Sequence, residues 1–572
     1  MRRTLRVLAP LALVGAIALW ATLPAAPLPI RLDESESLRR RTEWRGAYHV
    51  HSDRSDGTGT IDEIARAAAD AGLDFVILTD HGDATRTPEP PSYRSAVLII
   101  DAVEVSSTEG HYVVLGLDRP APYRLGGPAA AVVEDVRWLG GFGLAAHPDS
   151  PRRSLSWRDR AAPVDGLEWF NADSAWRDEP RGRLAFRLLA YPFRPGGTVA
   201  SLFDRPADAL GWWDATLASG RAVVTLAALD AHARLGMRGT DDEEGLGGAA
   251  LEVPSYREMF GIATNRVWLG STVTGDAARD ATLVVDAIRA GHVYSAIDPF
   301  ARPGFLRASL VAGGRRVQFG DRVRPGVRLD GRVEIDGPAG AEIRLLHNGL
   351  VVERSRGPSL AVSLELSAGS YRVEVHVPAS ADRRAGMPWI VTNALVAWPS
   401  DDNAQGAGAG IAPDAAALSA VDLATCRPEA DVDSSAAWTR NETGAYEFRY
   451  ELSRSTSPFA AVACPLPAAD GETGGLILEA RAEPVMRVLT QVRAPAADRD
   501  LRWGSSVRLE AAASRHAAPR SALVPVGREA ASANVAHADT LLLVIDRRHA
   551  PAGAVGRVIV NGIAATRTPA AP

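Results

Sequence analysis

The stretch Tyr48-His49-Val50-His51-Ser52-Asp53-Arg54-Ser55-Asp56-Gly57 contains two histidines one residue apart, followed by an acid and a glycine. Side chains alternate along a strand, so His49 and His51 project to the same face and both imidazoles can meet one cation. A turn at Gly57 can bring the carboxylate of Asp56 back to the same point. Such a pair is also typical of ordinary surface or capped histidines, and the rest of the chain decides between the two interpretations.

Helical and strand-like segments alternate after this stretch. A capping box at Thr60 and Glu63 opens a helix that Gly72 ends, and the apolar run at 73–79 predicts a buried strand. The same order continues through predicted strands at 96–105, 112–117, 143–146, 166–171 and 222–227 and predicted helices at 129–139, 181–190 and 207–219. This alternation predicts a parallel sheet, and polar residues follow its strands directly, where β/α barrels place their chemistry.

Titratable side chains gather at the ends of these predicted strands. The chain has 12 histidines, and the six that precede residue 290 nearly all border or end a predicted strand. The candidate metal ligands are His49, His51, Asp56, His81, Glu104, His111, His147, Asp230 and His232. Scattered structural histidines would also occupy helices and plain loops, so the pattern predicts one site for several metal ions. Asp53 and Glu109 are nearby alternatives to Asp56 and Glu104.

In this order the motifs resemble those of the polymerase and histidinol phosphatase (PHP) superfamily, over roughly residues 44–300. The matching residues are His49-x-His51 with Ser55-Asp56-Gly57, Thr79-Asp80-His81, Glu104 before His111, His147, and Asp230-x-His232. The resemblance implies a distorted (β/α)7 barrel with up to three divalent ions, which would be manganese, zinc or iron. Some members have a histidine where this chain has Asp56, and a carboxylate favours harder ions such as manganese.

The resemblance also implies how the ligands are shared among the ions. One ion would be held by His49, His51, Glu104 and Asp230. A second would be held by Glu104, His111 and His147, with Glu104 bridging the first two. The third would be held by Asp56, His81 and His232.

Two later motifs are similar to the group of this superfamily that includes the carbamate hydrolases CehA and McbA. They are Ala-Ile-Arg-Ala-Gly-His-Val-Tyr at 287–294 and Trp-Ile-Val-Thr-Asn at 389–393, and His292 in the first is expected to be structural. Clustered cations lower the pKa of a shared water and hold substrate oxygens, which suits hydrolysis. We therefore expect a phosphoesterase that uses a metal-activated water on a small anionic ester, with carboxylester or carbamate hydrolysis as the alternative.

Residues beside the candidate ligands are predicted to assist them. Asp80 and Asp149 could orient ligand imidazoles, although an Asp at such positions more often caps a turn. Arg54 and Arg234 could each bind an anionic substrate through two hydrogen bonds, unless they are solvated surface arginines. Asn171 ends an apolar run and is a further candidate for substrate binding.

Composition excludes several classes of function. There is no lysine in the sequence, which rules out Schiff-base chemistry and a phosphate-binding loop of the Walker type. The formal net charge is −6 and no dense basic tract stands out, so no nucleic-acid partner is expected.

Residues 1–29 are predicted to be a signal peptide or an N-terminal membrane anchor. Three arginines within the first six residues precede an apolar run at 7–23, whose length lies between the two cases. No Ala-x-Ala cleavage signal is evident, which favours an uncleaved anchor over a cleaved signal; a buried core helix is the remaining alternative. The chain is thus expected to be exported, with a periplasmic or other extracytoplasmic location and contact with the membrane through its N-terminus.

Beyond the predicted barrel at 44–300 the pattern changes to short alternating strands. Residues 301–399 predict a small β-sandwich, with Asn348-Gly349 as a hairpin turn, and residues 400–425 a linker. Residues 426–572 resemble a jelly-roll domain of the galactose-binding type. Trp503 in it would either stack on a sugar or lie in the core.

The fold class expected is therefore multidomain, a distorted barrel followed by two all-β domains. A function of another class also remains open, a glycan-binding protein of the cell envelope with a structural metal site. Cys426 and Cys464 are the two cysteines of the chain, and they either pair or stay buried as free thiols.

Overall fold

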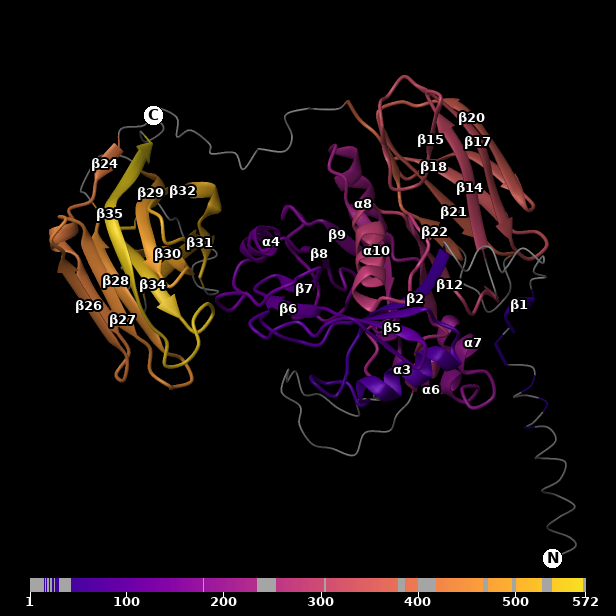
Figure 1. The fold of residues 1–572 in the computed structure, drawn as a ribbon, viewed down its shortest axis with the longest axis horizontal. Helices are drawn as coiled ribbons and strands as arrows, with labels where there is room; N and C mark the ends of the chain where they lie inside the picture. Colours follow the sequence, from indigo (N-terminus) through magenta and orange to yellow (C-terminus); the bar gives the residue numbers. More distant parts are fainter. Residues whose placement is uncertain are drawn as a thin grey trace, which may run out of the picture. The chain divides into compact units, whose positions relative to one another are not determined.

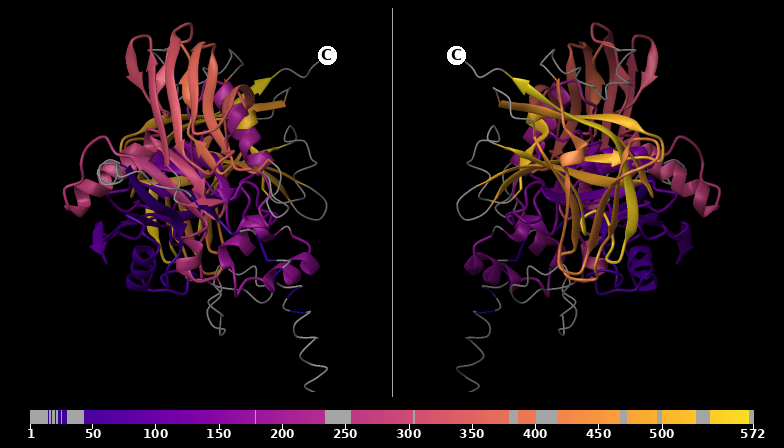
Figure 2. Two further views of the ribbon diagram at one scale, coloured as in Figure 1. Left: turned by 90° about the vertical axis from the view of Figure 1, so that its right-hand side faces the viewer. Right: turned by 90° about the vertical axis from the view of Figure 1, so that its left-hand side faces the viewer.

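The computed structural model describes residues 43–177, 179–233, 254–302, 305–378, 386–399, 418–466, 472–495, 500–526 and 538–568, with positions 15, 17, 20, 23, 24 and 26–29. The chain forms two compact units. Unit 1 comprises Met1–Gly82, Pro88–Asp118 and Val136–Ser400, and unit 2 comprises Asp83–Thr87, Arg119–Asp135 and Asp401–Pro572. Both are rich in strands (Figures 1 and 2), so the multidomain architecture with β-rich C-terminal parts is confirmed. The predicted linker lies largely outside the described residues.

The described helices are α3 (Ile61–Asp70), α4 (Ala129–Trp138), α5 (Ser174–Arg177), α6 (Arg181–Leu188), α7 (Pro195–Ala200), α8 (Ala207–Ala218), α9 (Tyr256–Met259) and α10 (Ala277–Arg289). Helix α3 starts at the predicted capping box: Thr60 Oγ1 accepts from the Glu63 N–H at 3.3 Å, and the Glu63 carboxylate accepts from the Thr60 N–H at 2.9 Å. Among the described residues, no helix has the length and apolar character needed to cross a membrane.

Two sheets of unit 1 carry the candidate site. The smaller has the strand order β10 (Val224–Ala228), β9 (Gly166–Asn171), β8 (Phe142–Ala145), β7 (Gly110–Leu115), β6 (Val103–Ser107). The larger has the order β16 (Arg322–Val323), β23 (Leu395–Ala397), β21 (Gly369–His376), β22 (Ile390–Thr392), β12 (Val293–Ile297), β11 (Ala263–Trp268), β2 (Glu43–Val50), β3 (Phe75–Leu78), β5 (Val97–Asp101), β4 (Ser92–Arg94), with β18 (Glu342–His347) and β19 (Leu350–Arg356) branching from β21.

Further strands complete unit 1. They are β1 (Leu28–Pro29) paired with β13 (Ala301–Arg302), and a sheet of β15 (Arg315–Val317), β14 (Phe305–Ala312), β17 (Arg328–Asp336) and β20 (Ser359–Glu365).

The two site-bearing sheets meet at their strand ends. The prediction of one strand at 96–105 is wrong, because β5 ends at Asp101 in the larger sheet and β6 begins at Val103 in the smaller one. Parallel bridges between His81 and Glu104, and between Val50 and Ala231, join the sheets there. Strands β2, β3 and β5 are parallel, as are β8, β9 and β10, whereas β6 to β8 are antiparallel. A complete (β/α)7 barrel stays a prediction.

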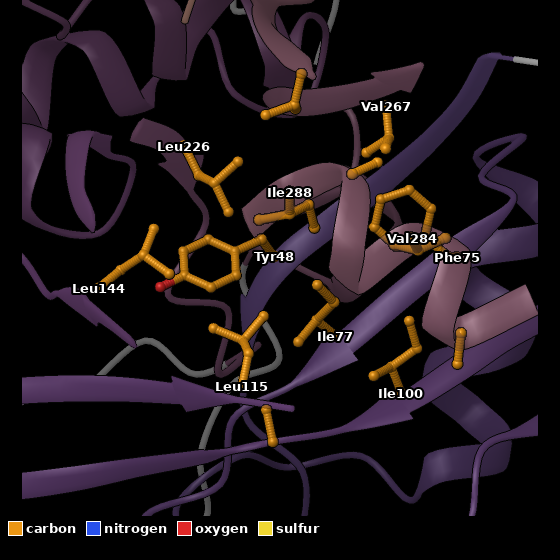
Figure 3. Packing of buried hydrophobic residues seen from close by; sticks show 14 of the residues in the cluster. Tyr48, Phe75, Ile77, Ile100, Leu115, Leu144, Leu226, Val267, Val284 and Ile288 are labelled. Carbon is orange, nitrogen blue, oxygen red and sulfur yellow. The ribbon is translucent and has the colours of Figure 1, made fainter. Parts of the chain in front are cut away.

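One hydrophobic core supports both sheets. Figure 3 shows the ring of Tyr48 among side chains of the two sheets and of α10, including Ile77, Leu115, Leu226 and Ile288. All of these side chains are buried, and burial of a large aliphatic side chain stabilises the fold by ~1.5–3 kcal/mol. The core therefore fixes the ends of the strands that carry the candidate ligands.

The larger sheet continues past residue 300 into the predicted sandwich. Strand β22 pairs with β12, and the Asn393 side chain after it bonds to both backbone groups of Thr225 and to the Val293 carbonyl at 2.8–3.1 Å. The two later sequence motifs lie here, and His292 contacts Asp321 at 2.8 Å, outside the candidate site. Residues of both motifs therefore stabilise this junction. The domain limits predicted from the sequence stay proposals.

Unit 2 contains two further sheets, with short 3-10 helices η1 (Leu423–Thr425) and η2 (Arg520–Ala522). One has the order β26 (Ser435–Arg440), β27 (Tyr446–Glu451), β35 (Val555–Thr568), β29 (Glu472–Glu483), β32 (Ser514–Pro519), with β24 (Leu418–Ala420) beside β35. The other has the order β25 (Arg427–Ala430), β28 (Phe459–Pro465), β34 (Thr540–Asp546), β30 (Met486–Ala494), β31 (Leu501–Leu509), β33 (Val524–Pro525).

Side chains of unit 2 answer two questions left open by the sequence. Cys426 and Cys464 form a disulfide. Trp503 is 3% exposed, so it is a core residue and presents no ring face for a sugar.

A buried charge network links α8 to the sandwich strands of unit 1. The Arg372 guanidinium contacts Asp214 and, at 3.0 Å, Glu374, while Arg205 donates two hydrogen bonds of 2.8 Å to Glu374. Burial alone would raise the pKa of Glu374, but His376 and the two arginines hold it well below its usual range. The carboxylate is therefore ionised in the folded state and offsets the charge of both arginines.

We predict that Glu374→Gln destabilises the protein by ~1–3 kcal/mol, because it removes the acid that pairs with Arg205 and one of the two acids that face the buried Arg372. The free energy of unfolding, measured with denaturant, checks this, with the exposed Glu365→Gln as the matched control. The difference should be full at neutral pH and shrink as pH falls below about 4, because the unfolded carboxyl then takes up a proton while the native carboxylate, whose pKa is held lower, stays charged. Equal stability of the two variants at pH 7 contradicts the prediction.

Candidate metal centre

The nine side chains selected from the sequence lie together in unit 1. Their ligand atoms form four overlapping groups in which all atoms lie within 4.8 Å of one another. The groups are His51–Asp56–His81–His232, His49–His51–Asp230, His49–Glu104–His147 and His81–Glu104–His111. The alternatives Asp53 and Glu109 belong to none of these groups. The convergence of residues spread over 184 positions, from 49 to 232, is the geometric result on which the site depends.

Glu104 lies at the centre of the cluster and is 1% exposed. Its Oε1 atom is 2.9 Å from His111 Nδ1 and 2.9 Å from His147 Nε2. Its Oε2 atom is 3.2–3.3 Å from nitrogens of three other imidazoles, those of His49, His51 and His81. The two oxygens thus face different sets of nitrogens, which is the arrangement that a bridging carboxylate requires.

Asp56, His81 and His232 form the solvent-facing part of the centre. Their side chains are 33%, 23% and 19% exposed, whereas His49 and His51 are fully buried. Asp56 Oδ2 lies 3.1 Å from His232 Nε2, and Asp56 Oδ1 lies 3.4 Å from His51 Nδ1. The imidazoles of His51 and His232 stack with ring centroids 4.3 Å apart. A molecule from solvent would reach this part of the centre first.

The backbone brings the ligands together by local distortion rather than by simple strand alternation. His49, His147 and Asp230 have φ values of 65°, 36° and 52°, which non-glycine residues rarely adopt. The β2–β3 register shifts between Tyr48 and Val50, so His49 occupies a bulge. His49 and His51 do reach one centre, but the period-two argument made from the sequence is not how they do so.

Hydrogen bonds between the ends of β2 and β10 hold this distorted backbone. The Ala231 N–H donates to the His49 carbonyl at 3.1 Å, and the His51 N–H donates to the Ala231 carbonyl at 3.0 Å. Unusual backbone angles of this kind cost ~1–3 kcal/mol each and persist where surrounding structure fixes them.

Glu168 is a member of the centre that the sequence analysis missed. It is fully buried on β9, and its Oε1 accepts from His49 Nδ1 at 2.5 Å. Its Oε2 accepts from the His147 N–H at 2.8 Å and from Asn171 Nδ2 at 3.0 Å. The sequence feature that could have indicated Glu168 is its position as a single acid inside the apolar run Gly166–Asn171. A carboxylate on Nδ1 keeps the proton on that atom and turns Nε2 of His49 toward Glu104 as a ligand.

The electrostatics of the centre suit cations. Burial alone would raise the pKa of Glu104, but the imidazoles of His49, His81 and His111 hold it well below its usual range, so the carboxylate stays charged. Burial alone would lower the pKa of His232, yet Asp56 and Asp230 raise it to about 10. At His232 the negative charges of the nearby acids thus outweigh the effect of burial, and the centre favours bound positive charge.

The donor set fits divalent metal ions. His51 Nε2 and His81 Nδ1 are buried without a hydrogen-bond partner among the described residues, although both point at the central carboxylate. Buried polar atoms without partners are rare in proteins, and a coordinated ion would satisfy them. Six imidazoles with three carboxylates is a mixture of nitrogen and oxygen donors suited to zinc, manganese or iron.

Neither arginine predicted to bind substrate is shown to be available for it. Arg54 is committed to three acids, with distances of 3.2 Å to Asp80, 2.8 Å to Glu89 and 3.1 Å to Asp101, so it is not an available anion clamp. Arg234 lies outside the described residues.

Asn171 lines a cavity of about 310 Å³ beside Glu168, together with Asp149 and Trp169. Its amide is held at both ends, by Glu168 and by the Ser174 N–H. It is therefore well placed on the cavity wall but has little freedom to turn toward a ligand.

Asp80 and Asp149 orient backbone rather than imidazoles. Asp80 accepts from the Ser52 N–H and hydroxyl and from the Ser55 hydroxyl, each at 2.7 Å, which fixes the loop that carries Asp56. Asp149 accepts from the Ala209 N–H in the first turn of α8. Capping, the alternative left open by the sequence, is the role that both perform.

Comparison with known proteins assigns part of this region. Residues 47–116 match the family model of the PHP domain. The matched segment carries six of the nine candidate ligands, from His49 to His111. A comparison with curated proteins finds no match.

Two solved structures illustrate the structural similarities. One is a two-domain protein from Bacteroides vulgatus that contains a predicted PHP-like metal-dependent phosphoesterase: 13% identity, 65% of this chain and 99% of that chain covered, TM-score 0.30. The other is a family 11 carbohydrate-binding module from Clostridium thermocellum: 12% identity, 27% and 99% covered, TM-score 0.22. At these TM-scores the similarities support no conclusion about this chain.

The contacts of Glu168 predict a specific defect. We expect Glu168→Gln to weaken divalent-cation binding by ~10–100-fold, because an amide oxygen holds the His49 Nδ1 proton less firmly. Calorimetric titration of the metal-free protein with zinc or manganese measures the effect. The exposed Glu89→Gln is the matched control, and binding equal to that control would remove Glu168 from the centre.

Proposed function

We propose that the protein is a metal-dependent hydrolase of the PHP type, and most specifically a phosphoesterase. The observation that supports this most is the position of Glu104, whose two oxygens face separate sets of imidazoles in one accessible cluster. A structural zinc site would be closed by four ligands, whereas this centre has more donors than one ion needs and an exposed edge.

We propose three ion positions, with the ligands shared as the resemblance to the PHP superfamily implies. His49, His51 and Asp230 with Glu104 would hold one ion, Glu104 with His111 and His147 the second, and Asp56, His81 and His232 the third. Bound ions would supply Lewis acidity toward the phosphoryl oxygens and activate water for attack.

The chain's own residues prepare this chemistry. Glu168 holds the proton at His49 Nδ1 and so fixes which nitrogen faces the centre. Asp80 fixes the loop that carries Asp56, and the paired ends of β2 and β10 fix His49 and Asp230. Because Arg54 is neutralised by three acids, the charge that attracts an anionic ester comes from the cations and not from this arginine.

Phosphoester hydrolysis is preferred to two alternatives. No residue of the centre favours the first, which is carboxylester or carbamate hydrolysis as in the CehA and McbA group. Glycan binding loses its main residue, because Trp503 is buried. Export with attachment through the N-terminal run, and a jelly-roll type for the domain at 426–572, remain part of our proposal and rest on the sequence pattern.

An assay on three substrate classes tests the function. We expect the chelated protein to be inactive, and manganese or zinc to restore hydrolysis of an aryl phosphate or aryl phosphodiester in preference to an aryl carbamate. Preference for the carbamate would replace the phosphoesterase with the alternative hydrolase. A protein that binds metal and hydrolyses none of the three would support a structural metal site.

Removal of one ligand provides a second test. His147→Ala should lower turnover of the preferred substrate by at least ~10³-fold, because His147 Nε2 faces both Glu104 and Asp230 and its loss empties one ion position. His292→Ala, which changes a histidine outside the centre, should leave the rate unchanged. A folded His147→Ala protein with the control's rate would exclude His147 from the site.

A further inference from the structure

Helix α6 and the turn that follows it present an unusual surface. Phe186, Leu188, Leu189 and Phe193 have exposed fractions of 52%, 36%, 63% and 62%, and these are the only exposed phenylalanines among the described residues. We call these four side chains the α6 patch. Exposed apolar side chains that gather within one short segment are a mark of interaction sites.

The patch is held rigidly from beneath. Ala190 is buried, and the Tyr191 hydroxyl donates to Glu258 Oε2 at 2.7 Å, which fixes the turn against α9. The side chains face solvent because the opposite side of the same segment is already anchored.

The charge around the α6 patch is positive. Between Asp178 and Arg194 the sequence contains four arginines, at positions 181, 183, 187 and 194, against two acids, and one of these acids, Glu179, lies 3.6 Å from Arg183. Apolar side chains interleaved with arginines are the pattern of a segment that lies in the interface of a bilayer, with its apolar groups among the acyl chains and its cations near anionic headgroups.

Residues that follow the N-terminal apolar run contact this segment. Arg194 Nη1 donates to the carbonyl of Pro24 at 2.5 Å, and Leu28 and Pro29 form β1 (Figure 1), which pairs with β13. The run ends at Leu23, one residue before that contact. Ile17 and Trp20 within it are 56% and 74% exposed, so the protein does not bury them in its own core.

We propose that the α6 patch is a membrane-contacting surface that inserts into an anionic bilayer and orients unit 1 on it. The contact between Arg194 and Pro24 ties the end of the apolar run to the patch, so a membrane that holds the run also meets the two phenylalanines. The proposal does not depend on the hydrolase chemistry, because none of the four side chains of the α6 patch is a candidate metal ligand.

A site-specific fluorophore tests this in the full chain. The native cysteines are paired, so Leu189→Cys provides a single free thiol for a bimane label. We expect its emission to shift to shorter wavelength, and to be quenched by nitroxide lipids, on vesicles of phosphatidylcholine with phosphatidylglycerol. The label at Leu350→Cys, a position 74% exposed on β19, should show neither change.

Two further measurements make the test decisive. Adding Phe186→Ser and Phe193→Ser to the Leu189→Cys protein should abolish the shift while the circular dichroism stays that of the parent. A label that remains in water on these vesicles would overturn the proposal. A shift that appears without vesicles and grows with protein concentration would also overturn it, because the patch would then bind a second copy of the chain.

Discussion

A carboxylate buried among imidazoles is the constraint on which the centre depends. An ionised Glu104 at 1% exposure is stable only if positive or hydrogen-bonding groups surround it, because an isolated buried charge is very costly. Nitrogens of five histidines lie within 3.3 Å of its two oxygens. Most other features of the centre follow from the need to place those rings, which come from four separate segments of the chain.

Strand ends can place imidazoles around Glu104 because the strand itself is held by the core, whereas the residue that follows it can turn in several directions. The core around Tyr48 anchors β2 and its neighbours, and the residues just beyond the strands turn toward the junction of the two sheets. Left-handed backbone at His49, His147 and Asp230 is the local cost of that turn. Hydrogen bonds between the ends of β2 and β10 stabilise the unusual backbone at His49 and next to Asp230.

The convergence of the nine side chains could be predicted from the sequence, because histidines are rare and nearly all of those before residue 290 border strands that end at the same junction. Glu168 was not predicted because a single acid within an apolar strand belongs to no sequence motif. Its contacts to His49 and His147 exist only after folding. The division at Ala102 was equally hidden, because the run Val97–Ile100 before it and Val103 and Val105 after it all favour strand, and Asp101 is the one polar residue between them. Arg54 was misjudged since its three acids lie 26–47 positions away.

The gradient of burial across the centre indicates how its parts differ in use. Glu104 and His49 themselves are buried, so an ion bound between them would offset buried negative charge. Asp56, His81 and His232 retain exposure of 19–33%, and the loop that carries Asp56 is held by Asp80 rather than by the core. Substrate oxygens would therefore meet the outer group first, against an inner group whose geometry is already fixed.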